Sequence, residues 1–278
     1  MARALTNPAP VRPGGLLYRP VPNLRELHGQ ATHFSTHPER MRIGSIPSPT
    51  PDFTIASSPH FDDMDITLDY GSLAMVDQLF QFSSEGVVGV GVPNQSSSDY
   101  QAKQLWEDED GRRWFFEVRP TIPDQMDRVR RILRHALAQR SRVILFPELA
   151  ITRDMLSPIE AIVRTEVAGP SLIIPGSYHD PDSGRHELRG WIVDSRPGFP
   201  PAVRPIEHQK FHPLRDYQPP GQTGSYQEFL DRTHGTGLPG RPTIRVYCGT
   251  AHRFSVLICA DAIPREVGEV LSEVGVTM

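Results

Sequence analysis

The pattern of apolar and polar positions becomes regular from about residue 86 onward. A continuous apolar run at 87–92, "VVGVGV", predicts a buried strand, and "WFFEV" at 114–118 predicts a second one. Residues 123–140 repeat their apolar positions at helical spacing. One side of this expected helix carries its apolar side chains, which are Met126, Val129, Ile132, Leu133 and Leu137.

Short apolar segments continue to the end of the chain. The run "RVILF" at 142–146 has the unbroken apolar character of a strand that is covered on both faces. Further strands are expected at 171–177, 189–195, 202–208, 243–248 and 254–259. A helix restarts after Pro264. This alternation of helices, strands and hairpins predicts an α/β fold with a mixed sheet and helices on its outer faces.

The first 85 residues follow a different pattern. They are rich in Pro, Ser, Thr and His and have few periodic segments, although one helix is expected within 64–82. We therefore divide the chain into an irregular or partly disordered leader of unknown role, residues 1–85, and one folded domain, residues 86–278.

Composition narrows the function classes. The formal charge is -4, with 29 basic and 33 acidic residues spread along 278 positions, so no basic stripe favours nucleic acid as a partner. No apolar run approaches the roughly 20 residues that a membrane span requires, and the N-terminus lacks a secretory signal. A cytoplasmic protein is expected. An Arg-containing transit peptide is the alternative, although prolines oppose a helix there.

The two cysteines support the same compartment. Cys248 and Cys259 fall on the two arms of one expected hairpin, 243–248 and 253–259. At about 3.3 Å per strand residue they lie roughly 20 Å apart, which is too far for a disulfide. Free thiols are typical of a reducing compartment.

Three reactive side chains follow predicted strands. Glu148 follows "RVILF" behind a proline, Lys210 follows 202–208, and Cys259 ends 254–259. Each has a plainer interpretation: a helix cap or lysine partner for the glutamate, a solvated lysine, and a core cysteine. Together they form an acyl-transfer set, because a thiol needs a base and the tetrahedral intermediate needs a positive charge.

The three segments that carry these residues resemble one known family. "RVILFPELAIT", "HQKFHPL" and "RFSVLICADAIPRE" are similar, in this order, to the signature regions of the nitrilase (carbon-nitrogen hydrolase) superfamily. The resemblance spans about 86–278. It implies Cys259 as nucleophile, Glu148 as general base, Lys210 as the residue that stabilises the intermediate, and the backbone N–H of Ala260 as an oxyanion donor.

The resemblance also implies a fold and a reaction. The fold is a four-layer α-β-β-α sandwich that usually forms a homo-oligomer. The reaction is hydrolysis of a non-peptide carbon-nitrogen bond in a small-molecule amide, nitrile or carbamoyl amine, without a cofactor. Two alternatives stay open: a non-catalytic nitrilase-like binding or scaffold module, and a glutaminase- or acyltransferase-type relative.

The chain departs from the family pattern in two places. The connection between Lys210 and Cys259 is longer than is common, and within it Glu228 is the candidate for a second glutamate that positions substrate. A solvated loop glutamate is the interpretation that the sequence favours for this residue. The sequence also stops about where the family's next strand begins, so we expect a domain that lacks its C-terminal part or is completed by another polypeptide.

The histidines suggest a rival chemistry. His208 and His212 are four residues apart and, with Cys259, could be imagined as zinc ligands. The segment does not have the pattern of a helix, so this spacing does not place both on one face. No metal site is predicted.

Overall fold

The computed structural model describes most of the chain beyond residue 63. The described residues are 64–80, 88–94, 96–103, 105–194, 201–219, 222–230, 243–250 and 252–276, with three short strands before them. The fold is mixed α/β. It divides into two compact units: Met1–Asp77 with Pro242–Val256 and Pro264–Met278, and Gln78–Arg241 with Leu257–Ile263. The sequence-based boundary near residue 85 stays a prediction.

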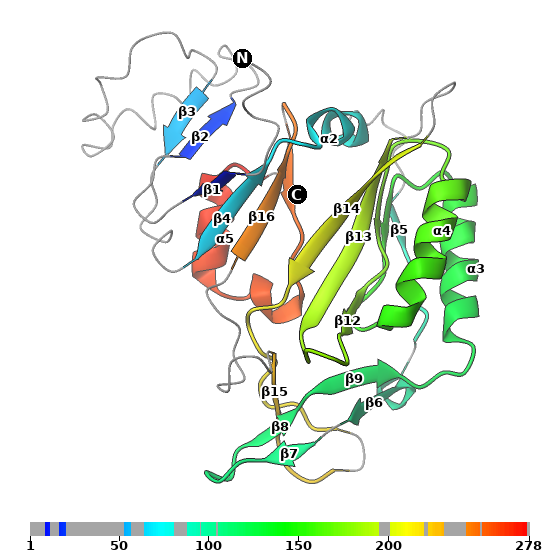
Figure 1. The fold of residues 1–278 in the computed structure, drawn as a ribbon, viewed down its shortest axis with the longest axis vertical. Coiled ribbons are helices and arrows are strands. Elements are labelled where there is room, and N and C mark those ends of the chain that lie inside the picture. The colour runs from blue at the N-terminus through cyan, green and yellow to red at the C-terminus, as the bar shows by residue number, and fades with distance from the viewer. Residues whose placement is uncertain are drawn as a thin grey trace. The chain divides into compact units, whose positions relative to one another are not determined.

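The first unit contains a four-stranded sheet in the order β1-β4-β16-β17 (Figure 1). Its strands are β1 (Ala9–Val11), β4 (Asp65–Asp69), β16 (Thr243–Cys248) and β17 (Arg253–Ser255). The unit also has the strand pair β2 (Leu17–Pro20) and β3 (Phe53–Ala56) and the helix α5 (Arg265–Glu273). Helix α2 (Leu73–Phe80), the one expected within 64–82, crosses the division between the units. Strand β4, which the sequence assigned to the leader, pairs in parallel with β16.

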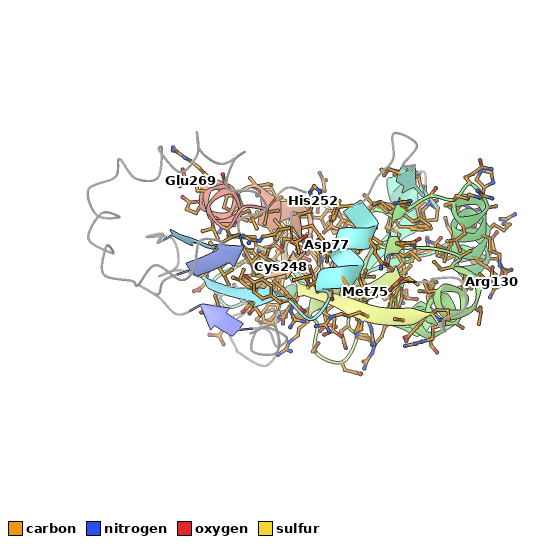
Figure 2. The ribbon with its side chains drawn as sticks, turned by 90° about the horizontal axis from the view of Figure 1, so that it is seen from above. Met75, Asp77, Arg130, Cys248, His252 and Glu269 are labelled. Atoms are coloured by element: carbon orange, nitrogen blue, oxygen red, sulfur yellow. The ribbon has the colours of Figure 1, made fainter. Side chains whose placement is uncertain are left out.

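The expected hairpin is confirmed around Cys248, but its second strand ends at Ser255, so Cys259 lies beyond the arm on which the sequence placed it. Cys248 lies opposite Arg253 in the β16–β17 pair. The turn is held by one backbone bond, from Gly249 N–H to His252 O at 2.8 Å, and by one bond from Thr250 N–H to the side-chain oxygen Oδ1 of Asp77 at 2.6 Å. Figure 2 labels Asp77, Cys248 and His252 in this region. Burial raises the pKa of the Cys248 thiol to about 11, and both cysteines are free.

The second unit is built on a mixed sheet in the order β12-β13-β11-β10-β5, with β14 also paired to β13. Its strands are β5 (Val88–Val90), β10 (Val143–Leu145), β11 (Ser171–Ile174), β12 (Ser177–His179), β13 (His186–Asp194) and β14 (Ala202–Gln209). Strand β10 runs parallel to β5 and β11, and the other pairs are antiparallel. The mixed sheet that the sequence predicts is confirmed.

Helices α3 (Gln125–Ala138) and α4 (Leu156–Glu166) cover one face of this sheet (Figure 1). As predicted, α3 turns its apolar side inward: Val129 and Leu133 are fully buried, while Met126, Ile132 and Leu137 pack around them. They meet strand and α4 side chains that are also fully buried, among them Ile144, Ile159, Val163, Ile173 and Trp191. This core holds the strands whose ends carry the candidate site.

Strand β5 corrects one expectation. The sequence predicted a buried strand, but Val88 and Val90 are 56% and 69% exposed. The glycines between the valines face the helix instead, because α3 comes too close for a larger side chain. A Cβ on Gly91 would lie 2.7 Å from Ile132 Cγ2.

Smaller strands form the rest of the second unit. They are β6 (Tyr100–Lys103) with β9 (Glu117–Pro120), and β15 (Gln227–Glu228), β8 (Arg113–Phe115) and β7 (Trp106–Glu107) in one sheet. The acidic turn 107–111 is the tip of the hairpin that β7 and β8 form. The predicted strand 114–118 is divided at Phe116 between β8 and β9. In β8, Phe115 pairs with Glu228 of β15. Short 3₁₀ turns are η4 (Ser97–Asp99), η5 (Arg153–Met155) and η6 (Cys259–Ala262).

Among the described residues, no helix is both long enough and apolar enough to cross a membrane.

Gly176 should be indispensable for the loop that follows β10. Its φ is +97°, and a Cβ there would lie 2.4 Å from the Pro147 carbonyl oxygen. We expect Gly176→Ala to lower the free energy of unfolding by about 2–4 kcal/mol, because strain and a backbone clash add. Gly169→Ala is the matched control, since a Cβ there meets nothing within 4 Å. Equal urea midpoints for the two variants would contradict this account.

Candidate active site

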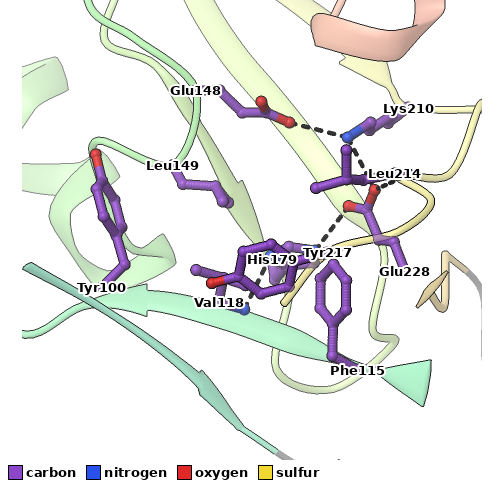
Figure 3. Close-up of a pocket in the computed structure, with 10 residues that line it drawn as sticks. All are labelled: Tyr100, Phe115, Val118, Glu148, Leu149, His179, Lys210, Leu214, Tyr217 and Glu228. Atoms are coloured by element: carbon purple, nitrogen blue, oxygen red, sulfur yellow. Dashed lines mark hydrogen bonds and ion pairs between the residues drawn. The ribbon is translucent and has the colours of Figure 1, made fainter. Parts of the chain in front are cut away.

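The structure brings together the three residues that the sequence singled out. Glu148 lies in the loop after β10, Lys210 directly follows β14, and Cys259 is the first residue of η6. Lys210 Nζ lies 2.9 Å from Glu148 Oε1 (Figure 3). Glu148 also acts on the Cys259 thiol, because its charge and a side-chain hydrogen bond raise the pKa of that thiol. All three belong to the second unit.

Lys210 is held between two carboxylates. Its ammonium contacts Glu148 Oε1 at 2.9 Å and Glu228 Oε2 at 2.8 Å, and the side chain is 1% exposed (Figure 3). Burial alone would lower the pKa of Lys210, but Glu228 and Glu148 outweigh it and the pKa is raised. The interpretation of Lys210 as a solvated lysine is therefore wrong.

Cys259 is exposed and has a strained backbone. Strand β17 ends at Ser255, earlier than predicted, and Cys259 opens η6 with a φ of +44°, a region that few residues other than glycine adopt. Such strain is found most often at functional sites. An exposed side chain also argues against the interpretation of Cys259 as a core cysteine.

The surroundings of the Cys259 sulfur act in opposite directions on the pKa of the thiol. Partial burial, together with the charge of Glu148 and its hydrogen bond, raises the pKa of Cys259. Lys210 and the backbone N–H of Ala260 act in the opposite direction. The resting pair is therefore a thiol that donates to a carboxylate, with an N–H group beside the sulfur.

Glu228 is buried at the centre of the site. Its Oε1 accepts from His186 Nδ1 at 2.6 Å and from His179 Nε2 at 3.0 Å, and its Oε2 contacts Lys210 Nζ and accepts from Leu214 N, both at 2.8 Å. The favoured interpretation as a solvated loop residue is wrong, because this carboxylate is 1% exposed. Each oxygen of Glu228 already has two donors, so the carboxylate has little capacity left to accept a further hydrogen bond. A direct contact with substrate, the other role considered for Glu228, is therefore disfavoured.

The charge of Glu228 is stabilised by these neighbours. Burial opposes ionisation, but the two histidines and the ammonium of Lys210 outweigh it and lower the pKa of Glu228 well below its usual range. The site thus holds two carboxylates and one ammonium.

His179, His186 and Glu228 are the group of described residues whose ligand atoms lie close enough to hold a metal ion. Their hydrogen bonds oppose this use. Val118 N–H donates to His179 Nδ1, so the proton of a neutral His179 is on Nε2 and faces Glu228. At 2.6 Å from a carboxylate, His186 Nδ1 must also carry its proton. The neighbouring ammonium would repel a cation as well.

Sequence reasoning missed these two histidines. The signal was present, because "DPDSG" at 180–184 is a turn sequence between two expected strands. The resulting hairpin of β12 and β13 places His179 directly opposite His186. Neither histidine lies in a motif of the family that the sequence resembles.

Asp261 ties the cysteine segment to the lysine segment. Its Oδ1 accepts from the backbone N–H groups of Phe211 and His212 at 3.1 and 2.7 Å, and its Oδ2 bonds to His208 Nε2 at 2.7 Å. The carboxylate is fully buried. These bonds hold the chain on both sides of Lys210. They also give His208 a structural partner, which disfavours its use as a zinc ligand together with His212 and Cys259.

A cavity of about 280 Å³ opens beside Glu148, Lys210 and Glu228 (Figure 3). This volume lies just below the usual range for ligand pockets. Six apolar or aromatic side chains line it: Tyr100, Phe115, Val118, Leu149, Leu214 and Tyr217. Among the described residues that line it there is no arginine.

The Asp261 contacts should be needed for stability. We expect Asp261→Ala to lower the free energy of unfolding by about 3–5 kcal/mol, because two buried donors and one partly buried donor lose their acceptor. Asp261→Asn keeps an acceptor for the two backbone groups and should cost about half as much. Asp127→Ala, an exposed ion-pair partner in α3, is the control. Urea unfolding measures all three. A loss of stability for Asp261→Ala no greater than for Asp127→Ala would show that the Asp261 contacts do not stabilise the fold.

Thiol alkylation should distinguish the two cysteines. Iodoacetamide should modify exposed Cys259 much faster than buried Cys248. Because the Glu148 carboxylate disfavours the thiolate, Glu148→Gln should shift the pH midpoint of Cys259 alkylation downward. Peptide mapping by mass spectrometry across pH measures both effects. An unchanged midpoint in Glu148→Gln would show that the carboxylate does not act on the sulfur.

Comparisons with protein-family models, with curated proteins and with solved structures found no match to this chain.

Proposed function

We propose that this chain is a cysteine-dependent hydrolase of a non-peptide carbon-nitrogen bond in a small amide, nitrile or carbamoyl amine. The observation that carries the proposal is the meeting of Glu148, Lys210 and Cys259 from three distant segments. A thiol, a carboxylate that accepts its proton and a buried ammonium are the groups that acyl transfer needs.

The proposed reaction on an amide begins with proton transfer. Glu148 takes the thiol proton while the Cys259 sulfur attacks the carbonyl carbon, and the Lys210 ammonium and the Ala260 N–H stabilise the resulting oxyanion. Collapse of the tetrahedral intermediate breaks the carbon-nitrogen bond, and the leaving amine takes the proton from Glu148. Water then attacks the thioester with Glu148 again as base, which releases the carboxylic acid and restores the thiol.

The resemblance of the three motifs to the carbon-nitrogen hydrolase superfamily supports the same function. The proposal therefore includes that family's four-layer α-β-β-α arrangement, a homo-oligomer, a cytoplasmic location and a reaction without a cofactor. The mixed sheet with helices on one face is compatible with this arrangement.

The cavity favours a small substrate with an uncharged acyl group. Apolar and aromatic side chains form most of its wall, and the single lysine is already paired with two carboxylates. A substrate carboxylate would meet excess negative charge and, in the part of the wall that the structure describes, no guanidinium. Neutral aliphatic amides should therefore be hydrolysed at least about 10-fold more efficiently than the same amides with a terminal carboxylate, because one poorly paired charge costs more than 1.4 kcal/mol.

Cys259→Ala should abolish turnover and leave folding intact, because it removes one exposed sulfur. Glu148→Gln should lower kcat similarly, by about 10³-fold or more, because it removes the base. Ammonia release from a panel of neutral amides and nitriles measures activity, and thermal unfolding checks the fold. Activity within a few fold of wild type in either folded variant would reject the mechanism.

The same panel separates the alternatives. A non-catalytic module would release no ammonia from any substrate and would show equally slow alkylation at both cysteines. A glutaminase- or acyltransferase-type relative would release ammonia preferentially from glutamine or transfer the acyl group to an added amine.

A further inference from the structure

A chain of hydrogen bonds connects Glu228 to the backbone beside Glu148. Leu149 N–H donates to Ser177 Oγ at 3.0 Å, and Ser177 Oγ lies 2.7 Å from His186 Nε2. The other ring nitrogen of His186 lies 2.6 Å from Glu228 Oε1. Lys210 links the second Glu228 oxygen to Glu148 and closes the circuit.

The direction of each bond follows from chemistry. His186 Nδ1 faces a carboxylate and so carries the ring proton, which leaves Nε2 as an acceptor. Ser177 must then donate its hydroxyl proton to His186 while it accepts from Leu149 N–H. Each hydrogen bond in the circuit therefore has one direction, and both nitrogens of His186 are used.

We propose that His186 is a positioning residue for the hydrolysis: through Glu228 and Lys210 it fixes the Glu148 side chain, and through Ser177 it fixes the peptide that follows Glu148. This role rests on the proposed function, in which Glu148 is the base. Neither His186 nor Ser177 lines the cavity.

The backbone at Leu149 supports this role. Leu149 has a φ of +58°, a left-handed conformation that is unfavourable for a residue with a Cβ. A strained peptide persists only where its surroundings hold it. The bond from its N–H to Ser177 is such a restraint, and it lies one peptide away from the candidate base.

Burial, more than the charges around it, keeps His186 neutral. The groups that face it are Glu228, His179, Lys210 and, at 3.7 Å, Glu148. Burial and then His179 lower the pKa of His186 to about 4, with Lys210 acting in the same direction and Glu228 opposing. A neutral ring can donate to Glu228 and accept from Ser177 at the same time, whereas a protonated ring could not accept.

Two substitutions break the same link from opposite sides. Ser177→Ala removes the hydroxyl. His186→Asn places an amide N–H near the former Nδ1, so it can still donate to Glu228 but no longer accepts from Ser177. We expect each variant to lower kcat by about 10- to 100-fold with KM within about 3-fold, because a small misplacement of a catalytic group has effects of this size.

The double variant tests whether one circuit is involved. Ser177→Ala with His186→Asn should be no worse than the worse single variant, within about 2-fold, because both break one link. His135→Asn, an exposed histidine of α3, should behave as wild type. Losses that multiply in the double variant would overturn the proposal.

A second readout does not depend on turnover. If Glu148 moves away from the thiol, the pH midpoint of Cys259 alkylation should fall in Ser177→Ala and His186→Asn, as in Glu148→Gln. Absence of hydrolysis by the wild-type chain would reject the proposed function, while this midpoint would still test the circuit. An unchanged midpoint in the near-isosteric Ser177→Ala, with the fold confirmed by thermal unfolding, would overturn the positioning role whatever the activity.

Discussion

The candidate site depends on one buried ammonium between two carboxylates. Lys210 is 1% exposed and lies within 3 Å of an oxygen of both Glu148 and Glu228. Breaking a buried ion pair by removal of one partner costs about 3–5 kcal/mol, because the remaining charge is left without compensation. Glu228 therefore requires Lys210, and Lys210 in turn fixes where Glu148 can be.

The pH range in which this arrangement holds follows from the two pKa shifts. The raised pKa of Lys210 contributes stability that is full below its ordinary value, about 10.4, and is lost as pH rises through the raised value. The lowered pKa of Glu228 contributes stability that is full above about 4.3 and is lost as pH falls through the lowered value. Between these limits the ammonium and the carboxylate stay charged.

The sequence predicted the three residues of this site that stand in short, recognisable motifs. An apolar run that ends in Pro-Glu, a lysine after a strand and a cysteine before Ala-Asp each mark a chemical group, and the mixed sheet follows from periodicity. Glu228 was misjudged because its burial comes from partners that are distant in the chain, His179 and His186 among them. The exposure of Val88 was also missed, since an apolar run does not reveal that a helix approaches the glycines on its other side.

The central claim is that Cys259 carries the acyl group during turnover. The most direct measurement is peptide mapping by mass spectrometry after rapid acid quenching of the chain with a small neutral amide. We expect a mass increase equal to the acyl group on the Cys259 peptide, and no such increase when Cys259 is replaced by alanine. Hydrolysis of that amide with Cys259 unmodified at every quench time, under saturating substrate, would contradict it.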